Sequence, residues 1–270
     1  MTGAMLQGHA ITAVTRSGAT MERAAAVFLP GILMPALFRY APLREELDDS
    51  RVTLMKELEI YAGDAAPADY SIATEVVGLD RFADHQGLDR FHLYGHSAGA
   101  AIALAYVAAH PDRLSSLALD EPASDFSDAD RRAIQVDLPA DLGDLPEPER
   151  MSRFARSLVR PDVDPPTLAP PGDSPEMAKR PPGLVAFSRA LFDHELDHAR
   201  LGSFAGPVYF SYGSLSNERW EAMAERLREE FRTCTVERYE GIHHLNTSHM
   251  AEPGRVAAAL ERLWADAETT

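Results

Sequence analysis

Residues 91–99 of the 270-residue chain read FHLYGHSAG, and this stretch decides the fold. Its first four residues predict a short β-strand, and the Ala-rich segment up to about Ala109 predicts a helix. Ser97 therefore lies at a tight turn from a strand into a helix. In such a turn the backbone is strained, and the residues two positions away must be small. Gly95 and Gly99 meet this requirement.

The turn gives Ser97 a setting suited to nucleophilic chemistry. Its geometry lifts the hydroxyl clear of the sheet, and the helix start beneath it offers free N–H donors for developing negative charge. Gly-x-Ser-x-Gly strings also arise by chance. Here the strand before, the helix after and the small residues 98–101 all match the required context, so we interpret Ser97 as a candidate nucleophile.

The rest of the chain alternates between strand-like and helix-like segments. The strand-like segments are 24–29, 52–60, 91–94, 114–119, 208–212 and 235–239, and the helix-like segments are 35–47, 70–85, 97–109, 217–231 and 253–267. Strands joined through single helices imply right-handed crossovers. The pattern therefore predicts an α/β protein with a doubly wound, mostly parallel sheet that is covered on both faces.

The alternation fails once, between Glu121 and Gly206. This segment is rich in Pro, Asp and Arg, and prolines prevent long helices; its centre, residues 161–183, reads PDVDPPTLAPPGDSPEMAKRPPG. Its flanks keep helical spacing, which favours an inserted cap or lid over a disordered linker. The predicted organisation is an α/β core of residues 1–121 and 207–270 with a Pro-rich cap at 122–206.

The amino-acid composition limits the kinds of molecule that the protein can bind. The chain has 26 Lys and Arg against 42 Asp and Glu, a formal charge of −16, which repels nucleic acid and anionic membrane surfaces. No apolar run reaches the roughly 18 residues that a membrane span needs. The single cysteine, Cys234, permits neither an intramolecular disulfide nor a zinc site built on several thiolates. Because the N-terminus does not read as a signal peptide, we expect a soluble cytoplasmic protein.

A serine nucleophile needs a base and an oxyanion hole. When the chain order is nucleophile, acid, histidine, the base follows the last strand, where His243 and His244 lie. One oxyanion donor would be the N–H of Ala98, directly after the serine. The other would be the N–H of Ile32, in the turn after the first strand, where Gly31 allows close backbone approach.

The acid is the hardest member to place. No carboxylate follows the strand at 208–212 before Glu218, so we expect the acid after the strand that follows the nucleophile helix. There Asp120 and Glu121 are adjacent, and strand alternation sends them to opposite sides, so one of them faces the histidine. We predict Glu121. Asp120 would then bond backbone or an arginine at the strand end, and Asp125 is a third alternative.

His249 and the two histidines of residues 194–198 are weaker candidates for a functional role. His249 is interpreted as a loop histidine that bonds backbone groups. Residues 194–198 read HELDH and match the zinc pattern H-E-x-x-H, but such strings arise by chance in a chain with ten histidines, and no third ligand is evident. We interpret the string as a polar helix end and expect no metal.

Two segments carry a family resemblance. GHSAGAAIALAYVAAHPDRLSSLALDEPA, at 95–123, resembles the nucleophile elbow, helix and next strand of the α/β-hydrolase superfamily. GIHHLNTSHMAEPGRVAAAL, at 241–260, resembles its histidine loop and last helix. The resemblance covers nearly all of residues 24–264 apart from the insertion. Pro30-Gly31 stands where the superfamily often has His-Gly.

The resemblance implies roles for individual residues. Ser97 would be the nucleophile, His244 rather than His243 the base, and Ile32 with Ala98 the oxyanion donors. The acid position after the earlier strand resembles that of one branch of the haloalkane dehalogenases, and thioesterases of the superfamily often share it. A serine nucleophile argues against a haloalkane dehalogenase or an epoxide hydrolase, since these use aspartate.

The sequence therefore predicts a serine hydrolase that cleaves a small carboxylic ester, lactone or thioester through an acyl-enzyme, without metal or organic cofactor. The expected partner is a small acyl molecule. The alternative is a ligand-binding or non-hydrolytic protein of the same fold. Residues of the cap would form an apolar substrate pocket: Phe154, Met177, Phe187 and Phe192.

Overall fold

The computed structural model describes residues 11–13, 23–123, 142–168 and 174–269. Within them a seven-stranded sheet has the order β1-β3-β2-β4-β5-β6-β7. The strands are β1 (Ile11–Ala13), β2 (Ala26–Leu29), β3 (Thr53–Lys56), β4 (Phe91–His96), β5 (Leu114–Asp120), β6 (Val208–Gly213) and β7 (Cys234–Tyr239). Strands β2 to β7 are parallel, which confirms the predicted fold class. The antiparallel edge strand β1 was not predicted.

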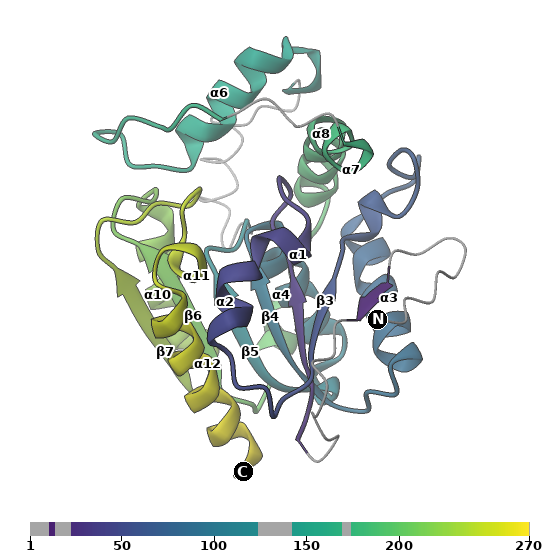
Figure 1. Cartoon of the computed structure of the whole chain (residues 1–270), viewed down its shortest axis with the longest axis vertical. Coiled ribbons are helices and arrows are strands. Elements are labelled where there is room, and N and C mark those ends of the chain that lie inside the picture. Colours follow the sequence, from purple (N-terminus) through teal and green to yellow (C-terminus); the bar gives the residue numbers. More distant parts are fainter. Residues whose placement is uncertain (1–10, 14–22, 124–141, 169–173, 270) are drawn as a thin grey trace.

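Helices cover both faces of this sheet. Those of the core are α1 (Ala36–Arg39), α2 (Ala41–Glu46), α3 (Ile72–His85), α4 (Ala98–Ala109), α10 (Arg219–Glu230), α11 (Ser248–Ala251) and α12 (Pro253–Glu268), with the 3₁₀ turns η1 (Glu59–Tyr61) and η2 (Pro111–Arg113). Strand β2 shows how the sheet separates two cores. Val27 and Leu29 pack with residues of α3, α4 and α10, whereas Ala26 and Phe28 pack with residues of α2 and α12, the face toward the viewer in Figure 1.

Two predicted elements differ in the structure: one is divided into two helices, and the other ends early. The helix predicted over 35–47 is divided at Tyr40 into α1 and α2. The strand predicted over 52–60 ends at Lys56, and η1 follows it. In both places the apolar pattern marks burial correctly, but burial alone does not distinguish a continuous element from a broken one.

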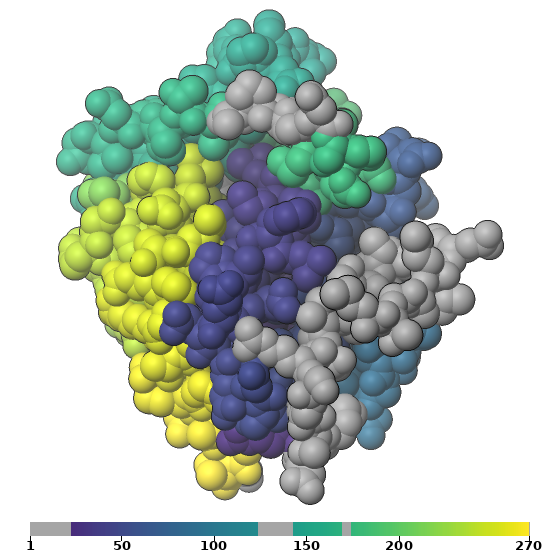
Figure 2. Space-filling view, in the orientation of Figure 1, coloured from purple at the N-terminus to yellow at the C-terminus, as the bar shows by residue number. Residues whose placement is uncertain are grey.

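The segment between β5 and β6 interrupts the α/β alternation. It contains η3 (Leu142–Asp144), α6 (Glu147–Ser157), α7 (Pro175–Ala178), α8 (Arg180–Phe192) and α9 (His198–Leu201). Prolines lie in the first turns of α6, α7 and α8, where a missing N–H costs no helical hydrogen bond. Figure 1 shows α6, α7 and α8 beyond the carboxyl ends of the central strands, and Figure 2 shows α6 across that end of the molecule.

The HELDH string does not lie on one helix. Helix α8 ends at Phe192 and α9 begins at His198, so the first four residues of the string connect two helices. The prediction of a polar helix end holds for Asp197, the N-cap of α9, and for His198, its first residue, whereas residues 194–196 lie between the two helices. Within the described ranges, no group of three or more potential ligands could hold a metal ion. Among the described helices, none combines the length and apolar character needed to cross a bilayer.

Candidate active site

Ser97 occupies a strained turn between β4 and α4. Its φ of 52° and ψ of −114° are unusual for a residue with a side chain. The flanking glycines are sterically required, because a Cβ at Gly95 would meet the backbone of Gly99, and a Cβ at Gly99 would meet that of Leu29. The Ser97 N–H donates to the Asp120 carbonyl at 3.0 Å, which fixes the turn against β5.

The Ser97 hydroxyl contacts a histidine that in turn contacts a carboxylate. The Ser97 Oγ lies 2.9 Å from Nε2 of His244, and Nδ1 of His244 lies 2.8 Å from Oε2 of Glu121. All three residues are buried. The structure thus brings together the residues selected from the sequence as nucleophile, base and acid. His243, the alternative base, makes no such contact in the described chain; its Nδ1 accepts from the N–H of Asn246.

Glu121 is held in place by the backbone at both ends. It is the first residue past β5 and has a φ of 47°, so a bend as well as strand alternation turns its side chain away from that of Asp120. Its Oε1 accepts a hydrogen bond from the Gly213 N–H at 2.7 Å, and its own N–H donates to the Ser211 carbonyl at 3.2 Å. The carboxylate is therefore oriented by β6 toward His244.

The environment of His244 favours a neutral imidazole. Burial lowers its pKa below the ordinary value, the Glu121 carboxylate opposes that shift, and Arg219 and Arg39 add to it. The Trp220 ring stacks on the imidazole with centroids 4.6 Å apart and planes 13° apart. Trp220 is itself fixed by a 2.9 Å hydrogen bond from its Nε1 to the Pro122 carbonyl. A neutral, oriented imidazole can accept a proton from the serine.

Two backbone N–H groups were selected from the sequence as oxyanion donors, those of Ile32 and Ala98. Among the described residues, the N–H groups of Ile32 and Ala98 have no hydrogen-bond acceptor. The loop that carries Ile32 is anchored on both sides: Tyr61 Oη donates to the Ile32 carbonyl at 2.8 Å, and the Gly99 N–H donates to the Pro30 carbonyl at 3.0 Å. These donors can serve an oxyanion that forms on a substrate attacked by Ser97.

A second acid–histidine pair lies beside the first. Oδ2 of Asp120 lies 2.7 Å from Nδ1 of His249. Four hydroxyl groups also donate to this carboxylate, those of Tyr94, Ser211, Thr247 and Ser248. The sequence-based expectations for both residues were wrong in their partners, because Asp120 bonds hydroxyls and a histidine rather than backbone or arginine, and His249 bonds side chains. Asp125, the third alternative acid, lies outside the described residues.

Arg39 completes this second cluster and was not predicted. Its Nε lies 2.8 Å from Nε2 of His249, and its Nη2 lies 3.1 Å from Nε2 of His96. A guanidinium can only donate, so both imidazoles accept at Nε2 and carry their proton on Nδ1. Burial lowers the pKa of His249 to about 4 and that of His96 well below its ordinary value. Both rings are therefore neutral beside a permanently charged arginine.

A cavity of about 600 Å³ opens over Ser97. Ile32, His96 and His244 line it from the core, and residues of α6, α7 and α8 together with residues 165–168 line it from the insertion. Two of the four predicted pocket residues line it, Phe154 and Met177. The other two do not: Phe187 is buried in the core, and Phe192 packs against that core from a partly buried position. The prediction was wrong for this pair because α8 packs both side chains against the core cluster rather than into the cavity.

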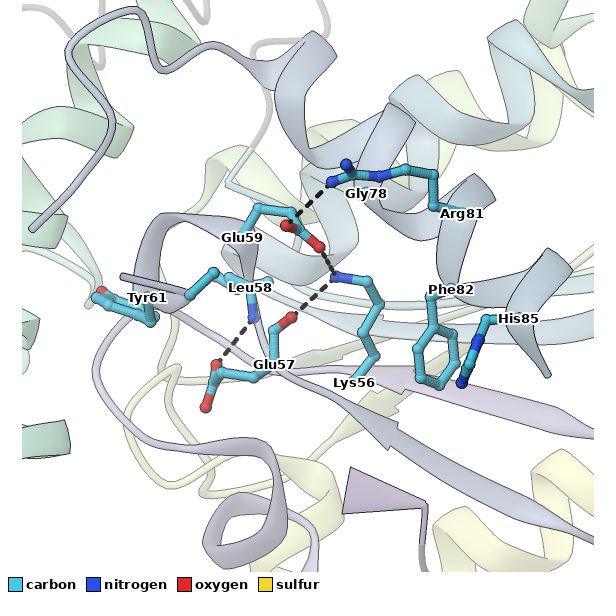
Figure 3. A pocket seen from close by; sticks show the side chains of 10 residues that line it. Lys56, Glu57, Leu58, Glu59, Tyr61, Gly78, Arg81, Phe82 and His85 are labelled. Atoms are coloured by element: carbon cyan, nitrogen blue, oxygen red, sulfur yellow. Dashed lines mark hydrogen bonds and ion pairs between the residues drawn. The ribbon is translucent and has the colours of Figure 1, made fainter. Parts of the chain in front are cut away.

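A smaller cavity of about 210 Å³ lies away from Ser97, between the end of β3, η1 and α3. Figure 3 shows its polar side chains satisfying one another: Glu59 pairs with Lys56 at 2.9 Å and with Arg81 at 3.5 Å. Since its charges are mutually compensated and no serine or cysteine lines it within the described chain, we do not consider it a candidate active site.

A serine on a strand-to-helix turn, with a histidine within hydrogen-bond distance on a doubly wound sheet, is the layout of the α/β-hydrolase class. A family model for the alpha/beta hydrolase fold matches residues 61–217, more than half of the chain. The chain belongs to this family.

Many solved structures share the fold at low sequence identity. MenH from S. aureus is 17% identical with a TM-score of 0.67, covering 93% of this chain and 97% of that one. A carboxylesterase of the thaumarchaeon Nitrososphaera gargenis is 16% identical with a TM-score of 0.70, covering 93% of each chain. A thermophilic esterase from Thermogutta terrifontis is 19% identical with a TM-score of 0.69, covering 95% and 97%. No curated protein matches the sequence.

Proposed function

We propose that this chain is a serine hydrolase that cleaves a small carboxylic ester, lactone or thioester through an acyl-enzyme. One observation carries the proposal, the continuous hydrogen-bonded chain from Ser97 through His244 to Glu121, with distances of 2.9 and 2.8 Å. Similarity of fold to esterases supports hydrolysis in general, but the assignment of ester or thioester chemistry rests on this site.

The proposed reaction has two halves. In the first, His244 Nε2 removes the proton from Ser97, whose Oγ attacks the carbonyl carbon, while the N–H groups of Ile32 and Ala98 stabilise the oxyanion. Glu121 keeps the proton of His244 on Nδ1 and stabilises the imidazolium that forms. The imidazolium then protonates the leaving group. In the second half, His244 activates a water molecule that hydrolyses the acyl-enzyme and releases the acid.

We further propose that residues 122–206 act as the cap of this site. Its described helices contribute apolar groups to the cavity wall opposite Ser97, among them Met151, Phe154 and Met177. An apolar wall suits the hydrocarbon part of an acyl substrate, because burying it removes that surface from water.

Turnover of p-nitrophenyl acetate and butyrate tests the proposal. The wild type should hydrolyse many equivalents per enzyme, and Ser97→Ala should reduce kcat by at least about 10⁴-fold, because no nucleophile remains. Ser203→Ala, the same chemical change at an exposed serine outside the site, is the matched control and should match the wild type. A single burst without turnover would favour the non-hydrolytic alternative, and full activity in Ser97→Ala would overturn the proposal.

A further inference from the structure

Arg39 stands in the wall of the active-site cavity although it is almost completely buried. It is the last residue of α1, which follows the Ile32 loop, and its exposed fraction is 7%. Together with His96 and Ser97 it lines the cavity. Arginine is rarely buried to this extent without a partner for its charge, because desolvating a cation is costly.

The hydrogen bonds of Arg39 go to neutral groups. Its Nε and Nη2 bond the imidazoles of His249 and His96, both of which accept and therefore carry no charge. Within the described ranges, no carboxylate lies within 4 Å of the guanidinium, and no group bonds Nη1. The nearest compensating charge is Asp120, which is separated from Arg39 by the ring of His249.

Arg180 provides an internal comparison, since it lines the same cavity. Its Nη2 and Nη1 lie 2.9 and 3.4 Å from the two carboxylate oxygens of Glu57, and its guanidinium lies 3.9 Å from the centre of the Tyr61 ring. The charge of Arg180 is therefore compensated by direct contact. Of the cations in the described cavity wall, Arg39 alone lacks such a contact, and the acid there, Glu147, is exposed.

The position of Arg39 places its charge near the reacting groups. The His96 ring that it bonds is the residue before Ser97, and that ring lies 5.0 Å from the His244 ring, centre to centre. The guanidinium is also fixed, because the Asp120–His249 pair holds its Nε and His96 holds its Nη2. A fixed guanidinium with a free edge recognises carboxylates well, since little side-chain entropy is lost on binding.

We propose that the substrate carries a carboxylate close to the scissile carbonyl, and that the Nη1 edge of Arg39 binds it. The expected substrate class is a half-ester or half-thioester of a dicarboxylic acid, or an ester whose alcohol part bears a carboxylate. This inference rests on the proposed hydrolase function, which it makes more specific. Such a substrate completes the compensation of a buried charge, which a neutral acyl ester does not.

Matched pairs of esters test the inference on the whole protein. The acyl-side pair is p-nitrophenyl hemiglutarate against p-nitrophenyl pentanoate, and the alcohol-side pair is 4-acetoxybenzoate against 4-acetoxybenzamide. The wild type should favour the anionic member of at least one pair by about tenfold or more in kcat/KM, the range of a charge-assisted hydrogen bond. The two pairs distinguish an acyl-side from an alcohol-side carboxylate.

Variants of Arg39 then assign the preference. Arg39→Gln should abolish it, mainly through KM of the anionic ester, and Arg39→Lys should restore part of it. The ratio of the two esters is the readout because loss of a purely structural contact lowers both alike. The double variant Arg180→Gln/Glu57→Gln is the control, because it removes a compensated ion pair from the same wall with no net change of charge, and its ratio should stay within about threefold of the wild type.

The outcomes are decisive for each proposal separately. A wild type that prefers the neutral ester in both pairs, or a folded Arg39→Gln that keeps the anionic preference, overturns the carboxylate site. If Arg39→Gln does not fold, calorimetric binding of glutarate to Ser97→Ala, weakened at least tenfold by adding Arg39→Lys, supports it, and absence of glutarate binding overturns it. If no ester is hydrolysed while glutarate binds, the hydrolase proposal fails and the carboxylate site stands.

Discussion

Two adjacent carboxylates at the end of β5 each bond a histidine, and the two acid–histidine pairs have different surroundings. Glu121 lies 2.8 Å from His244, and Asp120 lies 2.7 Å from His249, with all four residues buried. The difference is the partner of the far nitrogen. In one pair it is the hydroxyl of Ser97, and in the other it is the guanidinium of Arg39, a group that does not give up its proton. An acid–histidine pair can act as a base when the group bonded to the far nitrogen of the histidine can give up a proton, as a serine hydroxyl can. A permanent cation at that position cannot, so we call Asp120–His249 the scaffold pair and Glu121–His244 the reactive pair.

The scaffold pair connects parts of the chain that carry the first pair. Asp120 accepts hydrogen bonds from β4 and β6 through Tyr94 and Ser211, and from Thr247 and Ser248, which follow His244. Through His249 it reaches Arg39, which follows the Ile32 loop. The Asp120 cluster therefore fixes the His244 loop and the Ile32 loop relative to the strand that precedes Ser97.

The largest expected difference between the pairs is in turnover. Glu121→Gln should lower kcat by roughly 10³- to 10⁴-fold, because the amide cannot stabilise the imidazolium and allows the wrong tautomer of His244. Asp120→Asn should lower kcat by about tenfold or less, since it acts only by positioning. Steady-state kinetics on p-nitrophenyl butyrate measures both. The reverse ranking would transfer the role of the acid to Asp120.

The expected ranking of the two variants, Glu121→Gln and Asp120→Asn, is reversed for the free energy of unfolding. Asp120→Asn removes the nearest counter-charge of the buried Arg39 and disturbs the acceptor of four hydroxyl groups, so it should lower the free energy of unfolding by about 1–3 kcal/mol. Glu121→Gln keeps the shape of its side chain and disturbs fewer hydrogen bonds, so its loss should be smaller. Urea denaturation followed by tryptophan fluorescence measures both values. Equal losses would remove the distinction between a scaffold pair and a reactive pair.

The scaffold pair should also leave a signature in the pH dependence of stability. The pKa of His249 is about 4 in the folded chain and near 6.5 when unfolded, so the unfolded chain binds more protons between these values. The free energy of unfolding should therefore fall as pH falls from 6.5 to 4. His249→Gln should reduce this slope by up to one proton, about 1.4 kcal/mol per pH unit.

His92 supplies the comparison for that experiment, because burial also lowers its pKa to about 4 and it lies in neither pair. His92→Gln should reduce the slope similarly while leaving turnover near that of the wild type. A slope unchanged in His249→Gln would show that His249 is not a buried neutral group.

The smallest expected effect concerns the stacking partner of His244. Trp220→Phe keeps an aromatic face on the imidazole but loses the hydrogen bond to the Pro122 carbonyl. We expect kcat to fall by about three- to tenfold, the range of a weakened aromatic contact. The effect should appear in kcat rather than KM, because Trp220 positions the base and does not line the described cavity. A dominant change in KM would instead place Trp220 at the substrate.

Local patterns explain what the sequence could predict. The elbow at Ser97 is encoded within nine residues, and the parallel sheet follows from the alternation of short apolar strands with helices. Selecting Glu121 over Asp120 was harder, since alternation shows that the two diverge but not which one faces His244. That depends on the left-handed bend at Glu121 and on where the histidine loop returns.

Contacts between distant segments explain what it could not predict. Arg39 and His249 are 210 positions apart, and nothing in either local sequence marks their hydrogen bond. The insertion between β5 and β6 shows the same limit, because its aromatic residues are divided between the cavity and the core according to how its helices pack. Phe154 lines the cavity, but Phe187 packs into the core.

Labelling with a fluorophosphonate tests the central claim most directly, since this reagent reacts with a serine activated by a neighbouring base. Intact-mass and peptide analysis of the folded wild type should show one adduct, on Ser97, and Ser97→Ala should show none. The absence of an adduct on the folded wild type, or equal labelling of Ser97→Ala, would contradict the account.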